Sequence, residues 1–265
     1  MAAQANMILV TGASRGIGAA TAIAAARDGF DVAVNYISDA QAAHRVVQAI
    51  SEYGRKAIAV QGDVSIPSDV ERIFALAERA LGPLAGLVNN AGITGGIRPF
   101  VETNAETIER VFAINVFGAM HCARAALACF ARQAPLRAHA LAQAADMRQP
   151  RAGVIVNVSS VAARTGSPNE YVPYAASKAA IETFTLGLAR EVAASGIRVC
   201  AVAPGSTLTD IHAAGGAPDR PARIAAKIPM GRLAEPSEIA EAIVWLLSPA
   251  ASYVTGTVMH CAGGL

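Results

Sequence analysis

The feature that most constrains the fold is a glycine-rich segment between a short apolar run and an alanine-rich stretch of helical length. The segment spans residues 11–18 and reads TGASRGIG; it follows the apolar residues 7–10 and opens the stretch 17–27. Glycines let a chain turn sharply from strand to helix and approach a pyrophosphate, whose charge the N–H groups of the helix start stabilise. In this context the segment predicts a dinucleotide site in preference to a purely structural turn.

Short strand-like runs and amphipathic stretches of helical length alternate along the chain. We expect strands at residues 7–10, 32–36, 57–61, 86–89, 154–158 and 197–203, and helices at residues 17–27, 40–53, 69–80 and 178–194. This alternation is typical of βαβ units. It predicts an α/β fold of the Rossmann type, with helices on both faces of a doubly wound, mainly parallel sheet of about seven strands.

Local signals mark the expected boundaries of these elements. Ser68 followed by Glu71 predicts a capping box at a helix start, and Gly29, Gly54 and Gly196 predict helix ends just before strands. The alanine-rich stretch 132–152, with its glutamines and prolines, breaks the alternation. It predicts an insertion, either a surface loop or a helix extension.

Length and composition favour one domain, residues 1–265, with an extensive core. The apolar fraction of 53% lies above the usual range and the charged fraction of 16% lies well below it. A net charge of +2 provides no basic stripe, so we expect no nucleic-acid partner. The apolar residues 7–10 are too few for a signal peptide or a membrane span, which predicts a cytoplasmic protein without membrane contact.

The cysteine spacing suits neither a metal site nor a secreted disulfide framework, so we expect buried free thiols. The chain has 4 cysteines: Cys122, Cys129, Cys200 and Cys261. No cluster of His, Cys, Asp or Glu has metal-ligand spacing, and we expect no metal.

Small and polar residues follow two further expected strands. Residues 62–64 (Gly-Asp-Val) come after the strand 57–61, and residues 89–92 (Asn-Asn-Ala-Gly) close the strand 86–89. Each group alone is also typical of a turn. Because the carboxyl ends of strands form the binding edge of a doubly wound sheet, their shared location favours a binding role.

The residues that carry chemistry are Tyr174 and Lys178, which follow the strand 154–158 and the pair Ser159 and Ser160. A spacing of four puts Tyr174 and Lys178 on one helix face. A neighbouring ammonium favours the phenolate and lowers a tyrosine pKa that is normally about 10, so Tyr174 gains general acid/base capacity. In isolation, such a pair is more typical of a packed ring and a solvated ammonium. Beside a dinucleotide site, the catalytic interpretation is favoured.

These motifs resemble those of the short-chain dehydrogenase/reductase family, in its shorter single-domain branch, over essentially the whole chain. The resemblance implies one NAD(P)-binding Rossmann domain whose C-terminal half builds the substrate pocket. It also implies an NAD(P)(H)-dependent oxidoreductase that interconverts a carbonyl and a secondary alcohol. The motifs, in family order, are residues 11–18, residues 89–92, Asn115, Ser159 with Ser160, Tyr174 with Lys178, Pro204 with Gly205 and Thr209, and residues 262–264.

The resemblance further implies roles for single residues. Tyr174 donates or accepts the proton, while Lys178 lowers its pKa and holds the nicotinamide ribose. Ser160 hydrogen-bonds the substrate oxygen, and Asn115 anchors a water that links Lys178 to solvent. The implied cofactor-binding residues are Gly12, Ser14, Arg15, Gly16, Ile17, Gly18, Asn35, Tyr36, Asp63, Val64, Asn89, Ala91, Gly92, Tyr174, Lys178, Pro204, Gly205, Thr207 and Thr209.

One spacing departs from the commonest family pattern. Ser160 precedes Tyr174 by fourteen positions in place of thirteen, which a one-residue insertion in the loop 164–172 explains, since loops absorb length changes readily. Ser159 is the alternative for the serine role. Tyr171 is the rival acid, but no lysine follows it by four positions, so we expect it to line the substrate pocket.

The end of the second expected strand bears on the choice of cofactor. An acidic residue there would grip the ribose 2′-hydroxyl of NAD, and residues 34–38 contain none. Arg15, in the glycine segment, can pair with a 2′-phosphate. NADP(H) is therefore favoured, with NAD(H) as the alternative and Asp39 as the nearby acid that would support it. The resemblance puts Asp63 and Val64 beside the adenine.

The sequence leaves the substrate open. By analogy with relatives, we expect residues 94–97, Ala162, Tyr171, Ser206 and the segment 212–230 to surround it. The glycines and prolines of that segment indicate a lid. The leading hypothesis is a carbonyl reductase or alcohol dehydrogenase acting on a small molecule. A 3-oxoacyl thioester reductase and a sugar 1-dehydrogenase are its specific versions.

Two other classes remain as alternatives. An isomerase, dehydratase or epimerase on the same fold usually has a longer C-terminal substrate region. A non-enzymatic dinucleotide sensor would bind cofactor without turnover. The alanine-rich helices expected near Asn115 and Lys178 have more apolar surface than one sheet face needs, and relatives pair these helices. We therefore expect a homotetramer, with a dimer as the alternative.

Overall fold

The computed structural model of the chain describes residues 6–141, 152–209 and 224–265. Within these ranges, parallel strands form one 7-stranded sheet in the order β3-β2-β1-β4-β5-β6-β7. The strands are β1 Met7–Val10, β2 Asp31–Tyr36, β3 Ala57–Gln61, β4 Leu84–Asn89, β5 Gly153–Val158, β6 Ile197–Pro204 and β7 Val258–Cys261. The helices are α1 Gly16–Arg27, α2 Ala40–Ser51, α3 Pro67–Leu81, α4 Ala105–Phe112, α5 Ala119–Leu141, α6 Ala162–Thr165, α7 Val172–Val192 and α10 Pro236–Leu247, with the short helices η1 Phe100–Glu102, η2 Ala113–Gly118, η3 Ala193–Ser195 and η4 Pro249–Ala251.

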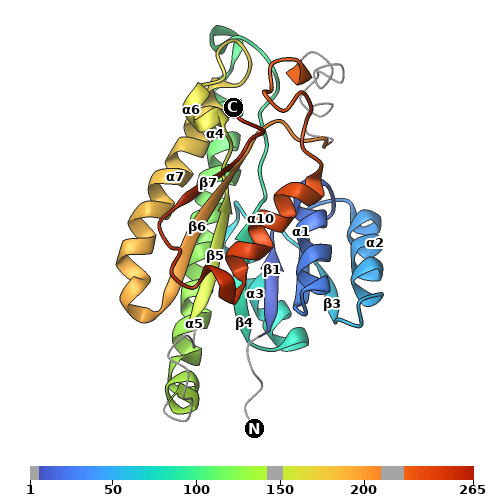
Figure 1. The fold of residues 1–265 in the computed structure, drawn as a ribbon, viewed down its shortest axis with the longest axis vertical. Helices are drawn as coiled ribbons and strands as arrows, with labels where there is room; N and C mark the ends of the chain where they lie inside the picture. The colour runs from blue at the N-terminus through green and yellow to red at the C-terminus, as the bar shows by residue number, and fades with distance from the viewer. Residues whose placement is uncertain (1–5, 142–151, 210–223) are drawn as a thin grey trace.

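Different helices cover the two faces of the sheet, because alternate residues of a strand point to opposite sides. In β1, Ile8 and Val10 join a buried cluster with α1, α2 and α10, whereas Met7 and Leu9 join a second cluster with α3, α5 and α7. Burial on both faces explains the continuous apolar runs of the sequence. The expected doubly wound α/β fold is confirmed (Figure 1).

The strand order creates a crevice at the carboxyl edge of the sheet. The chain proceeds outward from β1 to β3 on one side and from β4 to β7 on the other. The connections after β1 and β4 therefore diverge, which opens space for a ligand between them.

Two expected helix starts are wrong, and proline explains both. The predicted capping box at Ser68 and Glu71 does not form, because α3 already begins at Pro67 and no side chain caps it. Helix α7 begins at Val172, with Pro173 in its first turn, and not at residue 178. Proline favours the first helical turn because its φ is already helical and it has no N–H to satisfy.

The other expected boundaries are closer to those observed. Gly29, Gly54 and Gly196 lie just beyond α1, α2 and η3, and each has a positive φ, as helix-ending glycines do. Strand β7 was not among the expected strands. Helix α5 continues through residues 132–141 of the expected insertion, which favours a helix extension there; residues 142–151 lie outside the described ranges.

A continuous helical run of α4, the π-helix η2 and α5 covers one face of the sheet. Its part Ala105–Gln133 is long and apolar enough to cross a membrane by length and composition alone, but 50% of the most apolar window is buried inside the fold. Ile114 and Phe130 of this run belong to the core against the strands. We interpret the run as a core helix, and its apolar character reflects that packing.

Candidate active site

Two adjoining cavities open at the carboxyl edge of the sheet. The first, which we call the glycine-loop cavity, has a volume of about 650 Å³ and is lined chiefly by the connections after β1 to β4. The second, the tyrosine cavity, has a volume of about 440 Å³ and is lined by α7 and the connections after β4 to β6. Ile17, Asn90, Gly92, Thr94 and Thr209 line both, so the cavities form one continuous site.

The glycine-loop cavity brings most of the predicted cofactor residues together. Five others, including the tyrosine and lysine, line the tyrosine cavity, and Gly18 and Asn89 are not among the described residues that line either. The glycine-loop cavity contains Gly12, Ser14, Arg15, Gly16, Ile17, Asn35, Tyr36, Asp63, Val64, Ala91, Gly92 and Thr209. The tyrosine cavity contains Tyr174, Lys178, Pro204, Gly205 and Thr207.

The glycine loop has the close packing and the donors that a pyrophosphate requires. A Cβ atom on Gly12 would lie 2.9 Å from the Cα atom of Ala91, and one on Gly18 would lie 2.5 Å from the side-chain nitrogen of Asn90. Gly18 therefore serves packing behind the loop. The N-cap residue Arg15 makes no side-chain cap to α1, so the first N–H groups of α1 remain available to an anion. The loop fits a dinucleotide.

Asn89 and Asn90, at the end of β4, have different hydrogen-bond partners. The buried Asn89 amide donates to the carbonyl of Ala119 at 3.0 Å and to Oδ1 of Asn157 at 2.9 Å, which ties β4 to α5 and β5. Asn90 faces both cavities, and its amide donates to the carbonyls of Thr11 and Gly12. The Asn89 side chain, on the last strand residue, therefore points into the sheet packing, whereas that of Asn90 reaches the glycine loop.

Asn35, at the end of β2, braces the cavity wall with its entire amide group. Its Oδ1 accepts from the N–H of Gly12 at 3.2 Å, and its Nδ2 donates to the carbonyls of Val60 and Gly62. Asp39, the acid that would have favoured NAD, caps α2 by accepting from the N–H of Ala42 and does not line the cavity. Within the described residues, β2 thus sends no acidic side chain into the site.

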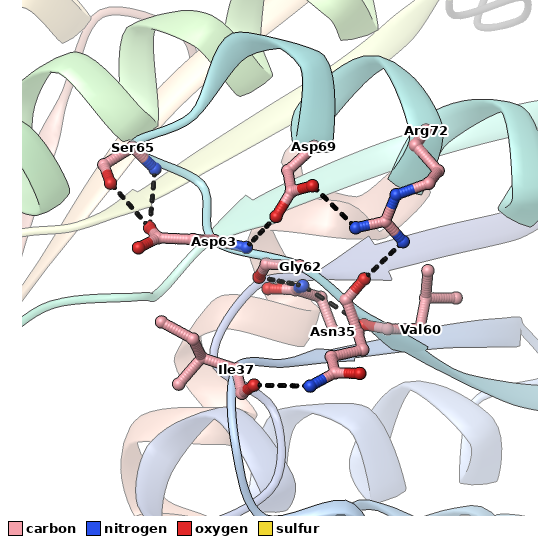
Figure 2. A network of polar contacts seen from close by, with 9 residues as sticks. Asn35, Ile37, Val60, Gly62, Asp63, Ser65, Asp69 and Arg72 are labelled. Atoms are coloured by element: carbon pink, nitrogen blue, oxygen red, sulfur yellow. Dashed lines mark hydrogen bonds and ion pairs between the residues drawn. The ribbon is translucent and has the colours of Figure 1, made fainter.

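Asp63 is held by a polar network that joins its loop to α3 and α4, and Figure 2 shows the part that includes Ser65, Asp69 and Arg72. Its carboxylate accepts from the N–H and hydroxyl of Ser65 and from the guanidinium of Arg110 on α4 at 2.7 Å. Its main-chain N–H donates to Asp69 on α3, which in turn pairs with Arg72. Partial burial raises the pKa of the Asp63 carboxyl, but the bonds from Arg110 and Ser65 outweigh it, and the pKa lies below its usual value.

Tyr174 and Lys178 meet beside the tyrosine cavity. The Nζ atom of Lys178 lies 5.6 Å from the centroid of the Tyr174 ring and donates to the carbonyl of Val158 at 2.6 Å. Lys178 is 4% exposed, and this burial lowers its pKa to about 8. Tyr171 packs edge-on against Tyr174, with ring centroids 5.3 Å apart. Tyr174 is therefore the tyrosine beside the ammonium.

The two serines after β5 have different surroundings. The Ser159 hydroxyl is buried and lies 3.0 Å from a carboxylate oxygen of Glu182 and 3.3 Å from the carbonyl of Lys178, both of which can only accept. The Ser160 oxygen accepts from the N–H of Ala162 at 3.1 Å, which leaves its proton available. This geometry favours Ser160 as the serine that faces a substrate.

Asn115 lies in the π-helix η2, and its side chain makes hydrogen bonds to Ile93 and to Ser177. Its Oδ1 accepts from the N–H of Ile93, and its Nδ2 donates to the carbonyl of Ile93 and to the hydroxyl of Ser177. A Cβ atom on Gly92 would lie 3.2 Å from Asn115 Oδ1 and 3.5 Å from Lys178 Nζ. Asn115, Gly92 and Lys178 therefore converge, and the Asn115 side chain ties the segment after β4 to α7.

The tyrosine cavity also contains the residues expected around a substrate. Thr94, Ile97, Ala162, Tyr171 and Ser206 line it, together with Ile224, Lys227, Ile228 and Leu265. The expected lid lies only partly in view: residues 210–223, including His212, are outside the described ranges. Sequence reasoning missed Arg110, Ser177 and Glu182, whose roles depend on contacts between distant segments, and it named Asn90 only as part of the motif at residues 89–92.

The cysteines are free; Cys122, Cys129 and Cys200 are buried, and Cys261 is partly buried. Desolvation raises the pKa of Cys122 to about 12 and that of Cys129 to about 11, and it also raises those of Cys200 and Cys261. In the described part of the chain, no group of His, Cys, Asp and Glu side chains is arranged to hold a metal ion.

Comparison with known proteins identifies relatives along nearly the whole chain. The sequence model described as short chain dehydrogenase matches residues 6–218. An uncharacterized oxidoreductase, YgfF, from Escherichia coli is 48% identical over 97% of this chain and 98% of its own. The 3beta-hydroxysteroid dehydrogenase 1 of Eggerthella lenta is 40% identical over 97% and 92%, and an L-rhamnose 1-dehydrogenase (NAD(P)(+)) of Sphingomonas is 36% identical over 99% and 96%.

Solved structures show the same architecture. A short-chain type dehydrogenase/reductase from Mycobacterium marinum has a TM-score of 0.86 at 30% identity over 98% of this chain and 94% of its own. A 3-ketoacyl-(acyl-carrier-protein) reductase from Brucella melitensis, complexed with NADH, has a TM-score of 0.85 at 31% identity over 98% and 97%. A short chain dehydrogenase from Burkholderia cenocepacia, in complex with NADP, has a TM-score of 0.82 at 32% identity over 98% and 97%.

Proposed function

Because the chain belongs to the short-chain dehydrogenase family, we propose that Tyr174, Lys178 and Ser160 interconvert a ketone and a secondary alcohol, with NADP(H) favoured. The coarser activity follows from the family: the chain is an NAD(P)-dependent oxidoreductase that acts on CH–OH donors. One observation carries the assignment of residues. The buried Lys178 ammonium lies 5.6 Å from the Tyr174 ring, in a cavity continuous with the glycine loop.

The chain's own groups handle the proton while the nicotinamide, when bound, supplies or accepts the hydride. Tyr174 holds the proton on its phenolic oxygen and gives it to the carbonyl oxygen as negative charge develops there. In the opposite direction Tyr174 takes the proton from the alcohol. The Lys178 ammonium stabilises the resulting phenolate, and the Ser160 hydroxyl donates a hydrogen bond to the reacting oxygen.

The glycine-loop cavity supplies suitable groups for the rest of the cofactor. The N–H groups at the start of α1, with Ser14, would hold the pyrophosphate. Asp63 and Val64 would flank the adenine, and Lys178 would hold the nicotinamide ribose. Asn35 would act indirectly, because its amide is committed to the cavity wall.

The surroundings of the β2 end support NADP(H) over NAD(H). Asp39 is engaged as the cap of α2, whereas Arg15 is exposed and lines the cavity. A guanidinium without a competing carboxylate at that position favours a ligand with a 2′-phosphate. The test is kcat/KM with NADPH and NADH at equal concentrations, and a clear preference for NADH would contradict the proposed cofactor.

The proposed proton transfer is tested by removing the phenolic oxygen alone. We expect Tyr174→Phe to lose about 10²–10⁴-fold in kcat, because the carbonyl oxygen loses its acid. Binding of NADPH, followed by its fluorescence, should persist. Tyr171→Phe is the matched control and should lose less than about tenfold, since the residue four positions after Tyr171 is Ala175 and not a lysine. Full turnover in Tyr174→Phe would rule out the mechanism.

The substrate follows from a panel of compounds, monitored by nicotinamide absorbance. The relatives named above act on steroids, a sugar and an acyl-carrier thioester, so the panel includes hydroxysteroids, aldoses, 3-oxoacyl thioesters and simple ketones. We propose a 3-oxoacyl thioester or a sugar as the specific versions. Cofactor binding without turnover of any member would instead favour a dinucleotide sensor.

A further inference from the structure

The charge balance of the glycine-loop cavity depends on one ion pair. Among the described residues that line this cavity, Asp63 is the one acidic side chain, and Arg15, Arg98 and Arg110 are the basic ones. The Nη2 atom of Arg110 lies 2.7 Å from Oδ2 of Asp63, and its Nη1 atom lies 2.9 Å from the hydroxyl of Ser65. The Asp63 side chain is 15% exposed and that of Arg110 is 44% exposed. Arg110 of helix α4 therefore partly covers the Asp63 carboxylate.

A second arginine, Arg72, helps to hold the loop that carries Asp63 through contacts that do not involve Arg110. The main-chain N–H of Asp63 donates to Asp69 at 2.8 Å, and Arg72 links Asp69 to the carbonyl of Gln61. The Gln61 side chain donates in turn to the carbonyl of Ile37, directly after β2. Figure 2 shows Asp63, Asp69, Arg72 and Ile37 of this chain of contacts. Because the loop is already held by Asp69 and Arg72, Arg110 is not needed to position the backbone, and its charge is its distinct contribution.

An unpaired carboxylate at this place would discriminate between the two cofactors. Like charges repel in proportion to their product, so one extra negative charge weakens a ligand with an additional 2′-phosphate more than a ligand without it. Arg110 cancels the charge of Asp63 and leaves Arg15 and Arg98 to set the sign of the potential. The acid can then remain in the cavity wall without opposing a phosphorylated adenosine.

We propose that Arg110 is a specificity-determining residue that neutralises Asp63 and so admits the 2′-phosphorylated dinucleotide. The inference rests on the proposed function in that it assumes the glycine-loop cavity takes the adenosine half of the cofactor. It adds a residue on α4 that acts on cofactor choice through Asp63.

The test is direct binding of NADPH and NADH, measured by their fluorescence without substrate. Arg110→Met should raise the Kd for NADPH by about tenfold and the Kd for NADH by about threefold or less. The resulting change in the ratio of the two Kd values should shrink at high salt. Arg110→Gln removes the charge but keeps donors for Asp63 and Ser65, and it should change the ratio in the same direction. Arg110→Lys should preserve the wild-type ratio, and Asp63→Asn combined with Arg110→Met should restore it.

The matched control is Arg132→Met, which removes an arginine from an ion pair between α5 and α3, away from the cavity. It makes the same change in net charge and should leave the ratio unchanged. An unchanged ratio in both Arg110→Met and Arg110→Gln, or an equal change in Arg132→Met or Arg110→Lys, would overturn the proposal. A wild type that prefers NADH would contradict the proposed cofactor, whereas the effect of Arg110 is judged separately by the change in ratio. Melting temperatures of all variants identify any that fail to fold.

Discussion

Lys178 places an ammonium in the protein interior, and this placement links stability to pH. The group is 4% exposed, and burial lowers its pKa to about 8, against about 10.4 for an unperturbed lysine. The unfolded chain therefore binds the proton more tightly than the folded chain. Below pH 8 both states are protonated and the full cost of burying the charge is present. The cost is relieved as the pH rises from about 8 to about 10.4.

We predict that Lys178 makes the fold more stable as the pH rises. The free energy of unfolding of the wild type, relative to that of Lys178→Met, should increase by about 2–3 kcal/mol between pH 7 and pH 10. The measurement is urea unfolding of both proteins without cofactor at several pH values. The buried thiols have the opposite effect above about pH 8.5, but both proteins contain them and the difference cancels their contribution. A difference that stays flat with pH would contradict the buried-charge interpretation.

At the scale of single residues, the sequence predicted the identity of the site better than the direction of its side chains. Tyr174 and Lys178 are four positions apart, and a local spacing on one helix is readable. The bond from the Gly12 N–H to Asn35 and that from Arg110 to Asp63 join positions 23 and 47 apart. No periodic pattern marks such pairs, so Asn35 was expected to bind cofactor directly, and Arg110 was not singled out.

At the scale of elements, the contact between α5 and β5 depends on the absence of one side chain. A Cβ atom on Gly153 would collide with the ring of Phe130, which is 1% exposed. Phe130 is among the largest fully buried side chains of the core. The glycine at the start of β5 thus lets the aromatic ring of α5 lie directly on the strand.

We predict that Gly153→Ala destabilises the fold by about 1–3 kcal/mol, because a packed ring cannot move away without strain. Thermal or urea unfolding measures the loss. Phe130→Leu should also destabilise, but the double variant should lose less than the sum of the two single losses, since the smaller side chain makes room for the methyl group. Additive losses would show that the clash is not the cause.

The predictability of each element follows from how it is buried. Strands β1, β5 and β6 are buried along their whole length and appear in the sequence as largely apolar runs, interrupted only by Asn157 in β5 and Arg198 in β6. The residues of β7 are only partly buried and include His260, so no such run marks it. Helix starts were misplaced where proline, and not a capping side chain, sets the first turn.

At the scale of the whole molecule, large apolar side chains of η2 and α7 are exposed in the part of the chain that the structure describes. These helices pack against each other and expose Phe117, which is 53% exposed, and Leu186, which is 39% exposed. Large apolar side chains on adjoining helices favour association of like subunits. We propose that the faces that carry these side chains pair in the expected tetramer.

We predict a molecular mass by light scattering of four times that of one chain. Phe117→Glu combined with Leu186→Glu should shift the protein towards smaller species, because charged groups would be buried at the contact. Tyr53→Glu, at a side chain of similar exposure after α2 on the other side of the sheet, should leave the mass unchanged. A monomeric wild type at working concentration would refute the assembly.

The architecture was readable because a parallel sheet buried on both faces leaves a strong apolar pattern, and the position of the site followed from the carboxyl edge of that sheet. The arrangement of the helices around the cavities depends on long-range contacts. Only the folded chain shows that α4 and α7 reach the site from the same face of the sheet as α3.

The unbroken run of α4 and η2 fixes the distance and the relative orientation of two contacts at opposite ends of the site. At one end, Arg110 pairs with Asp63. At the other end, Asn115 accepts a hydrogen bond from Ile93 and lies beside Lys178. Each residue added to or removed from a helix rotates everything beyond it by about 100°. A one-residue insertion between positions 110 and 115 would therefore break one of these two contacts even if the other were kept. Family members that share both contacts should tolerate length changes in their surface loops but keep this five-residue interval intact.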